Sequence, residues 1–124
     1  MSNLKKISLI LLVLLYLAAG VNHFRSAAAY ISVIPPYFPY PKLLNTLAGC
    51  FEIFFGLMLI FKKTRTYAVY GIILMLIVFT TVHIYMIRLA PFKLSGFMVS
   101  RAVAWIRLPL QLVLMAWAYW HRED

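Results

Sequence analysis

The sequence predicts an all-α membrane protein: an antiparallel four-helix transmembrane bundle forming a single integral membrane domain over residues 1–124. Hydrophobic residues make up 65% of the chain and its mean hydropathy is +0.90. A soluble domain of this length cannot bury so much apolar surface in one core. The apolar residues also form four runs close to the roughly 20 residues that a helix needs to cross a bilayer. These runs are Ile7–Phe24, Leu43–Phe61, Tyr67–Ile87 and Ala102–Trp120.

The first run, Ile7–Phe24, also has features of a secretory signal peptide. Two lysines precede it, and a small-residue segment, Ser26–Ala29, follows it in the manner of a cleavage site. The run is longer than the usual apolar region of a signal peptide, which favours a retained transmembrane helix.

A segment rich in proline and tyrosine, Tyr30–Lys42, connects the first two runs. Its prolines prevent a continuous helix, and its aromatic rings suit the boundary between membrane and water. We expect this loop to form a rigid lid over the outer mouth of the bundle. A plain interfacial anchor explains the same composition.

The second run contains Glu52, which is the one acidic residue between Met1 and Glu123. A carboxylate in hydrocarbon costs about 3 kcal/mol on insertion scales, so it usually faces the protein interior and has a partner. Asn45, Gly49, Glu52 and Gly56 recur at helical spacing and therefore share one face. Small residues on that face would allow a neighbouring helix to approach closely.

The last two runs also contain polar residues. His83 lies near the end of the third run, and Arg107 and Gln111 lie in the first half of the fourth. Pro109 interrupts the fourth helix, because proline cannot donate a backbone hydrogen bond, and so frees a carbonyl near Trp105.

The intramembrane polar groups converge in one half of the membrane, because successive spans alternate in direction. At 1.5 Å per residue, Glu52 and Gln111 lie roughly 13 Å below the outer end of their spans and Arg107 roughly 8 Å. We predict a polar pocket in the outer half, with Arg107 as the counter-ion of Glu52 and with Arg25 and Arg101 as alternatives. The candidate ligand-binding or proton-exchange residues are Glu52, His23, Arg107, Gln111, Asn22 and His83.

The basic residues predict the orientation, since positive charge near span ends favours the cytoplasmic side. Lys62, Lys63 and Arg65 crowd one very short connection, on the same side as Lys5 and Lys6. We therefore place both termini in the cytoplasm, although the opposite side carries nearly as many cations. The position of His121 beyond the last span predicts a contact with lipid headgroups.

Several classes of function are disfavoured. The charge of +9 lies mostly at span ends, where it suits membrane lipids rather than nucleic acid. A single cysteine excludes an intrachain disulfide, and no HxxxH or ExxH spacing supports a metal site. No covalent cofactor is evident, since flavin, haem and iron–sulfur motifs are missing. The apolar inner half speaks against a channel or transporter.

The chain resembles the DoxX-like family of small bacterial four-span membrane proteins. The resemblance covers about residues 13–120. It consists of short motifs that occur in the same order and at similar spacing as in the family. They are Gly20-Val21-Asn22-His23-Phe24, Ile34-Pro35-Pro36-Tyr37-Phe38-Pro39, Ala48-Gly49-Cys50-Phe51-Glu52 with Gly56, Ala68-Val69-Tyr70-Gly71, Val78-Phe79, Ile84-Tyr85-Met86 and Arg107-Leu108-Pro109-Leu110-Gln111.

The resemblance implies a four-helix bundle in the bacterial inner (cytoplasmic) membrane. It places His23, Glu52, Arg107 and Gln111 on the family's polar motif positions, whereas His83 stands where members carry an asparagine after a proline. Members of the wider family resemble subunits of quinone-linked oxidoreductases, components of oxidative-stress complexes and membrane-protein assembly factors. Fold does not determine activity.

The leading hypothesis is a membrane subunit of a redox or stress-related system that binds a quinone or lipid in the outer-leaflet pocket. Electron transfer would need an oxidoreductase partner, and whether the chain is itself an enzyme stays open. The alternative is a non-catalytic assembly factor or scaffold. A scaffold should expose Glu52 or Gly49 to lipid, whereas a ligand site should enclose them.

Overall fold

The computed structural model describes residues 1–94 and 96–124 and is mostly helical. The elements in chain order are α1 Asn3–Arg25, α2 Ala27–Ser32, α3 Pro41–Ile60, α4 Lys62–Leu89, β1 Phe92–Leu94, β2 Phe97–Val99 and α5 Arg101–Trp120. Four of these helices, α1, α3, α4 and α5, are long and apolar enough to cross a membrane, judged by length and composition. Each covers one of the four apolar runs, with only Phe61 of the second run left outside α3, so the prediction of four long apolar helices is confirmed.

Two connections differ from the expected irregular loops. The alanines at 27–29 are strong helix formers, and they begin the short helix α2, which ends before Pro35 and Pro36. Between α4 and α5 the chain forms a small antiparallel sheet, in which Phe92 of β1 lies opposite Val99 of β2. The expectation of an all-α chain is therefore correct for the spans and wrong for this hairpin, in which Phe92, Phe97 and Val99 favour strands.

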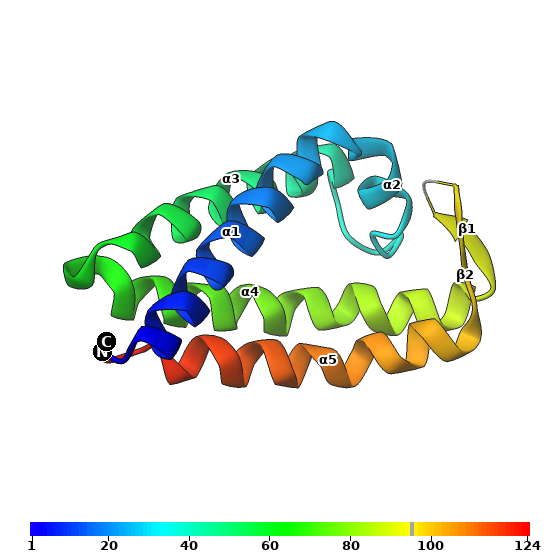
Figure 1. Cartoon of the computed structure of the whole chain (residues 1–124). Coiled ribbons are helices and arrows are strands. Elements are labelled where there is room, and N and C mark those ends of the chain that lie inside the picture. The colour runs from blue at the N-terminus through cyan, green and yellow to red at the C-terminus, as the bar shows by residue number, and fades with distance from the viewer. Residues whose placement is uncertain (95) are drawn as a thin grey trace.

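The long helices are arranged as two pairs (Figure 1). Helix α1 packs along α3, and α4 packs along α5. The pairs meet at the end where both chain termini lie and where Phe61 alone separates α3 from α4. They diverge toward the opposite end, which carries α2 and the β1–β2 hairpin. We call these the terminal end and the hairpin end.

The α1–α3 pair is held close by two glycines. A Cβ atom added to Gly20 would lie 2.8 Å from the carbonyl oxygen of Gly49, and one added to Gly49 would lie 3.0 Å from the carbonyl oxygen of Gly20. A side chain at either position would push the two backbones apart. The predicted close approach at the Gly49 face is confirmed, and its partner is α1.

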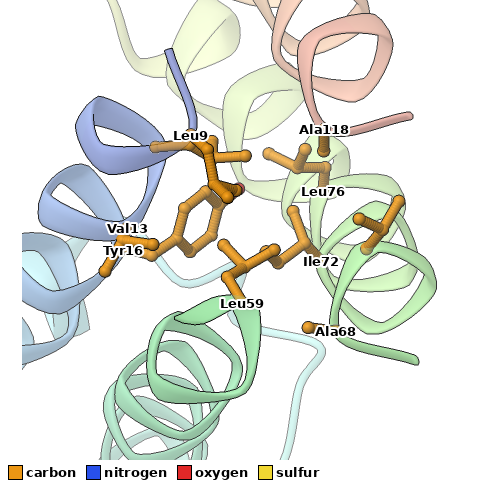
Figure 2. Packing of buried hydrophobic residues seen from close by; sticks show 10 residues of the cluster. Leu9, Val13, Tyr16, Leu59, Ala68, Ile72, Leu76 and Ala118 are labelled. Carbon is orange, nitrogen blue, oxygen red and sulfur yellow. The ribbon is translucent and has the colours of Figure 1, made fainter. Parts of the chain in front are cut away.

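Buried apolar side chains form two separate clusters. The larger one joins α1, α3, α4 and α5 toward the terminal end, and Figure 2 shows Tyr16 and Leu59 pointing toward Ile72 and Leu76. The smaller one ties residue 33 to α4, β2 and α5 at the hairpin end. Its members are Val33, Met86, Ala90, Val99 and Ala104. Four buried polar residues lie between these clusters along the helices: His23, Asn45, Glu52 and Gln111.

A polar network, which we call the terminal clasp, connects the two chain ends. Lys5 Nζ lies 2.7 Å from Asp124 Oδ1, and His121 Nδ1 lies 2.6 Å from Asp124 Oδ2. His121 Nε2 lies 3.1 Å from Ser8 Oγ, which also accepts a hydrogen bond of 2.8 Å from Trp117 Nε1. His121 is fully buried, so its expected contact with headgroups is wrong. The return of the chain end over α1 encloses it.

The clasp predicts a pH dependence of stability. Burial alone would raise the pKa of Asp124, but hydrogen bonds from Lys5 and His121 outweigh it and lower that pKa below its ordinary value. A depressed carboxyl pKa stabilises the fold above the ordinary value of about 4 and loses this contribution as pH falls through the folded pKa. When the pH is lowered from about 6 to about 3 in detergent, the unfolding temperature of Asp124→Asn should therefore fall less than that of the unchanged protein. Parallel curves would contradict this role.

Candidate functional site

The predicted polar residues lie in a layer between the two apolar clusters. Glu52 retains only 5% of its surface exposed, and Asn45, Gly49 and Gly56 on the same stripe of α3 are buried with it. The helical spacing therefore identified the inward face of α3 correctly. His23 of α1 and Gln111 of α5 are also buried, whereas Arg107 and His83 are half-buried.

The charged partner of Glu52 is His23. Its Nε2 atom lies 3.4 Å from Glu52 Oε2. Among residues 1–94 and 96–124, no arginine lies within 4.0 Å of this carboxylate, so the expected ion pair with Arg107 is wrong. Arg25 and Arg101 are exposed and are not its counter-ions either. The reason is the pairing of helices: α3 packs on α1, and Arg107 belongs to the other pair.

The contact between His23 and Glu52 is electrostatic rather than a hydrogen bond. Its length exceeds the range of roughly 2.7–3.2 Å for N–H···O bonds. Glu52 Oε2 is buried and accepts no hydrogen bond from the part of the chain that the structure describes. A buried acceptor without a donor costs about 1–3 kcal/mol. This atom is therefore able to accept a hydrogen bond from another molecule.

Asn45, which the list of candidate residues omitted, holds the other side of the His23 ring. Its Nδ2 donates a 2.9 Å hydrogen bond to the backbone oxygen of His23, and its Oδ1 lies 2.8 Å from His23 Nδ1. Both residues are buried. A signal existed in the sequence, because Asn45 lies two helical turns before Glu52 on the same face.

Helix α2 adds an aromatic contact at the hairpin side of this group. The ring of Tyr30 stacks on His23 with centroids 4.0 Å apart, and Asn22 Nδ2 donates a 2.8 Å hydrogen bond to the Tyr30 hydroxyl. Asn22 is exposed and thus supports Tyr30 rather than facing Glu52 directly. The sequence offered no signal for Tyr30, because its segment was expected to be an irregular loop.

The second helix pair holds Arg107 in a fixed position. Arg107 donates a 2.8 Å hydrogen bond to Gln111 Oε1, and Gln111 Nε2 donates one of 3.0 Å to the backbone oxygen of Leu76. His83 Nδ1 is buried and has no hydrogen-bond partner in the described residues.

Two further observations limit the chemistry of the site. In the part of the chain that the structure describes, no group of three or more His, Cys, Asp or Glu residues is placed to hold a metal ion. A shallow hollow of about 400 Å³ runs along α1 outside the polar layer. It is lined by Leu14, Leu17, Ala18, Val21, Asn22 and Arg25. Arg25 thus belongs to the surface of α1 and not to the surroundings of Glu52.

A family model described as "Domain of unknown function (DUF8561)" matches residues 12–122, which include every residue of the polar layer. No curated protein and no solved structure matches the chain.

Proposed function

This protein belongs to the DUF8561 family, and we propose that it is a DoxX-like membrane protein that binds a quinone or a lipid in its polar layer. The observation that carries the proposal is the buried Glu52 Oε2 atom, to which no group among residues 1–94 and 96–124 donates a hydrogen bond. Intramembrane charged residues are functional candidates by default, and this one is enclosed by its own bundle. A ligand that donates a hydrogen bond to Oε2 would remove the cost of leaving it unpaired.

The two helix pairs supply complementary groups for such a ligand. Glu52 and His23 exchange a proton or hydrogen-bond with it, and Arg107 binds a carbonyl or anionic oxygen. Gln111 holds the guanidinium in place, which reduces the side-chain entropy lost on binding. His83, whose Nδ1 has no hydrogen-bond partner in the described part of the chain, contacts the same ligand from α4. Electrons come from an oxidoreductase partner in a redox or stress-related system.

The four long helices cross the bacterial inner membrane, and the termini lie in the cytoplasm. This orientation is supported by the exposed Lys6, Lys62 and Lys63 at the terminal end, since cations collect on the cytoplasmic side. The polar layer then lies toward the outer leaflet, below α2 and the hairpin. Membrane lipids are its surroundings and one source of ligand.

The alternative of an assembly factor or scaffold is less well supported. A scaffold would present Glu52 or Gly49 to a partner helix, whereas both are buried between α1 and α3. The burial of this face favours a site that encloses its ligand.

Retention of bound lipid tests the proposal. The protein is purified in mild detergent, and co-bound quinones and lipids are extracted and quantified for four proteins: unchanged, Glu52→Gln, Arg107→Ala and Arg88→Ala. Loss of a hydrogen bond to a charged group should lower retention about tenfold or more in the first two variants. Arg88 is exposed near the end of α4 and serves as the matched control. Equal retention in all four proteins, or none in any, contradicts the proposal.

A further inference from the structure

The orientation of the Asn45 amide determines where the His23 ring carries its hydrogen. Asn45 Nδ2 donates to the backbone oxygen of His23 at 2.9 Å, so the opposite atom of the amide, Oδ1, faces His23 Nδ1 at 2.8 Å. An amide oxygen can only accept a hydrogen bond. His23 Nδ1 therefore carries a hydrogen in the buried site.

This assignment restricts the contact between His23 Nε2 and Glu52 Oε2, which lie 3.4 Å apart. If the ring were neutral and Glu52 ionised, two lone pairs would face each other with no hydrogen between them. Two arrangements avoid this repulsion: an imidazolium beside a carboxylate, or a neutral imidazole beside a carboxylic acid. Both give the pair one exchangeable proton, carried either by Nε2 or by the Glu52 carboxyl group, and both give the pair zero net charge.

We propose that His23 and Glu52 hold a single exchangeable proton as a pair of zero net charge, and that Asn45 is the positioning residue that sets this state. Without an acceptor at Nδ1, the neutral ring would place its hydrogen on Nε2 and donate it to an ionised Glu52. The pair would then carry one net negative charge, which is costly inside a bundle surrounded by hydrocarbon. Asn45 avoids that charge by accepting from Nδ1.

The other groups around His23 and Glu52 do not compete with Asn45 for the hydrogen on His23 Nδ1. Tyr30 of α2 stacks on the His23 ring, and its hydroxyl accepts a hydrogen bond from Asn22 Nδ2. His83 of α4 and Arg107 of α5 complete the surroundings, and neither lies within 4.0 Å of the Glu52 carboxylate in the described chain. Asn45 is therefore the group whose hydrogen bond determines the tautomer of His23.

The inference adds a function to the proposed ligand site and rests on it only for the identity of the proton acceptor. A ligand that first binds by donating a hydrogen bond to Glu52 Oε2 can then take the proton of the pair on a second oxygen, and the pair is left with one negative charge. Water supplies the proton that restores zero net charge. The site thus gives or takes one proton per ligand.

The protonation state is measured without any ligand. Nitrogen NMR of ¹⁵N-histidine-labelled protein in micelles distinguishes imidazolium, Nδ1–H and Nε2–H rings, and His23→Gln identifies the His23 signals. Infrared difference spectra against Glu52→Gln report whether Glu52 is ionised. We expect either imidazolium with ionised Glu52 or the Nδ1–H ring with protonated Glu52. A neutral Nε2–H ring in the unchanged protein overturns the proposal.

Two substitutions at Asn45 separate positioning from packing. Asn45→Leu should convert His23 to the neutral Nε2–H ring beside an ionised Glu52, whereas Asn45→Asp keeps an oxygen acceptor and should keep the hydrogen on Nδ1. Unchanged spectra in Asn45→Leu overturn the role of Asn45. If that variant does not fold, the unchanged protein and Asn45→Asp still decide, because loss of the Nδ1 hydrogen in either one overturns the inference. If the spectra are as expected but no quinone or lipid is retained, the proposed function is contradicted and the state of the His23–Glu52 pair is not.

Discussion

Replacing Arg65 by alanine is expected to lower the free energy of unfolding by about 3 kcal/mol or more. The guanidinium is buried with 7% of the residue exposed. It donates hydrogen bonds of 2.8 Å and 3.1 Å to the backbone oxygens of Leu59 and Ile60 at the end of α3, and one of 2.6 Å to that of Asp124. The last carbonyls of a helix have no partner within it, so the substitution would leave several acceptors unpaired. Denaturant unfolding in detergent measures the loss.

Two control variants make the result specific to the guanidinium. Arg65→Lys keeps the charge, but its compact ammonium group cannot reproduce the planar set of donors of a guanidinium. We therefore expect an intermediate loss of stability. Lys63→Ala removes an exposed cation from the same first turn of α4 and should change stability by about 0.5 kcal/mol or less. Equal stability of Arg65→Ala and Lys63→Ala would show that the buried hydrogen bonds contribute nothing.

Replacing Leu59 by alanine should destabilise the fold by about 2–5 kcal/mol, the usual range for removing a fully buried leucine. Leu59 has no exposed surface and lies at the centre of the larger apolar cluster, where α3 meets α4 and α1 (Figure 2). The substitution would leave a cavity at the place where the two helix pairs are joined. Thermal or denaturant unfolding in detergent measures the effect.

Leu57→Ala is the matched control, because Leu57 lies on the same helix with 47% of its surface exposed. Its side chain contacts lipid or detergent rather than the core, and little stability should be lost. If both leucine variants lost the same stability, the larger cluster would not be the structural core.

The helices were predictable because the length of an apolar run depends on the chain alone. All four runs correspond to long helices, and their boundaries differ from the predictions by a few residues. The inward face of α3 was equally predictable, since Asn45, Glu52 and Gly56 follow the helical period and are buried. The hairpin between α4 and α5 was missed because three-residue strands leave too short a pattern to recognise.

The partner of Glu52 was not predictable. The sequence places polar residues at similar depths on several helices, but depth does not decide which helices touch. Contact between the backbones at Gly20 and Gly49 brings α1 onto α3 and so puts His23, rather than Arg107, beside the carboxylate. Arg65 shows the same limit, since the sequence used it only to predict the orientation and the structure buries it.

The sequence by itself determined four apolar helices, the faces they bury and a set of polar residues confined to one part of their length. The length of an apolar run and the helical period of its residues can be read from a short stretch of sequence. The apolar face of each helix is buried whichever helices become its neighbours. The tertiary structure alone decided the pairing of α1 with α3, the bond from Asn45 that orients His23, and the burial of a Glu52 oxygen that no described residue pairs. These depend on which backbones approach within a few ångströms, and that is settled by packing between residues distant in the chain.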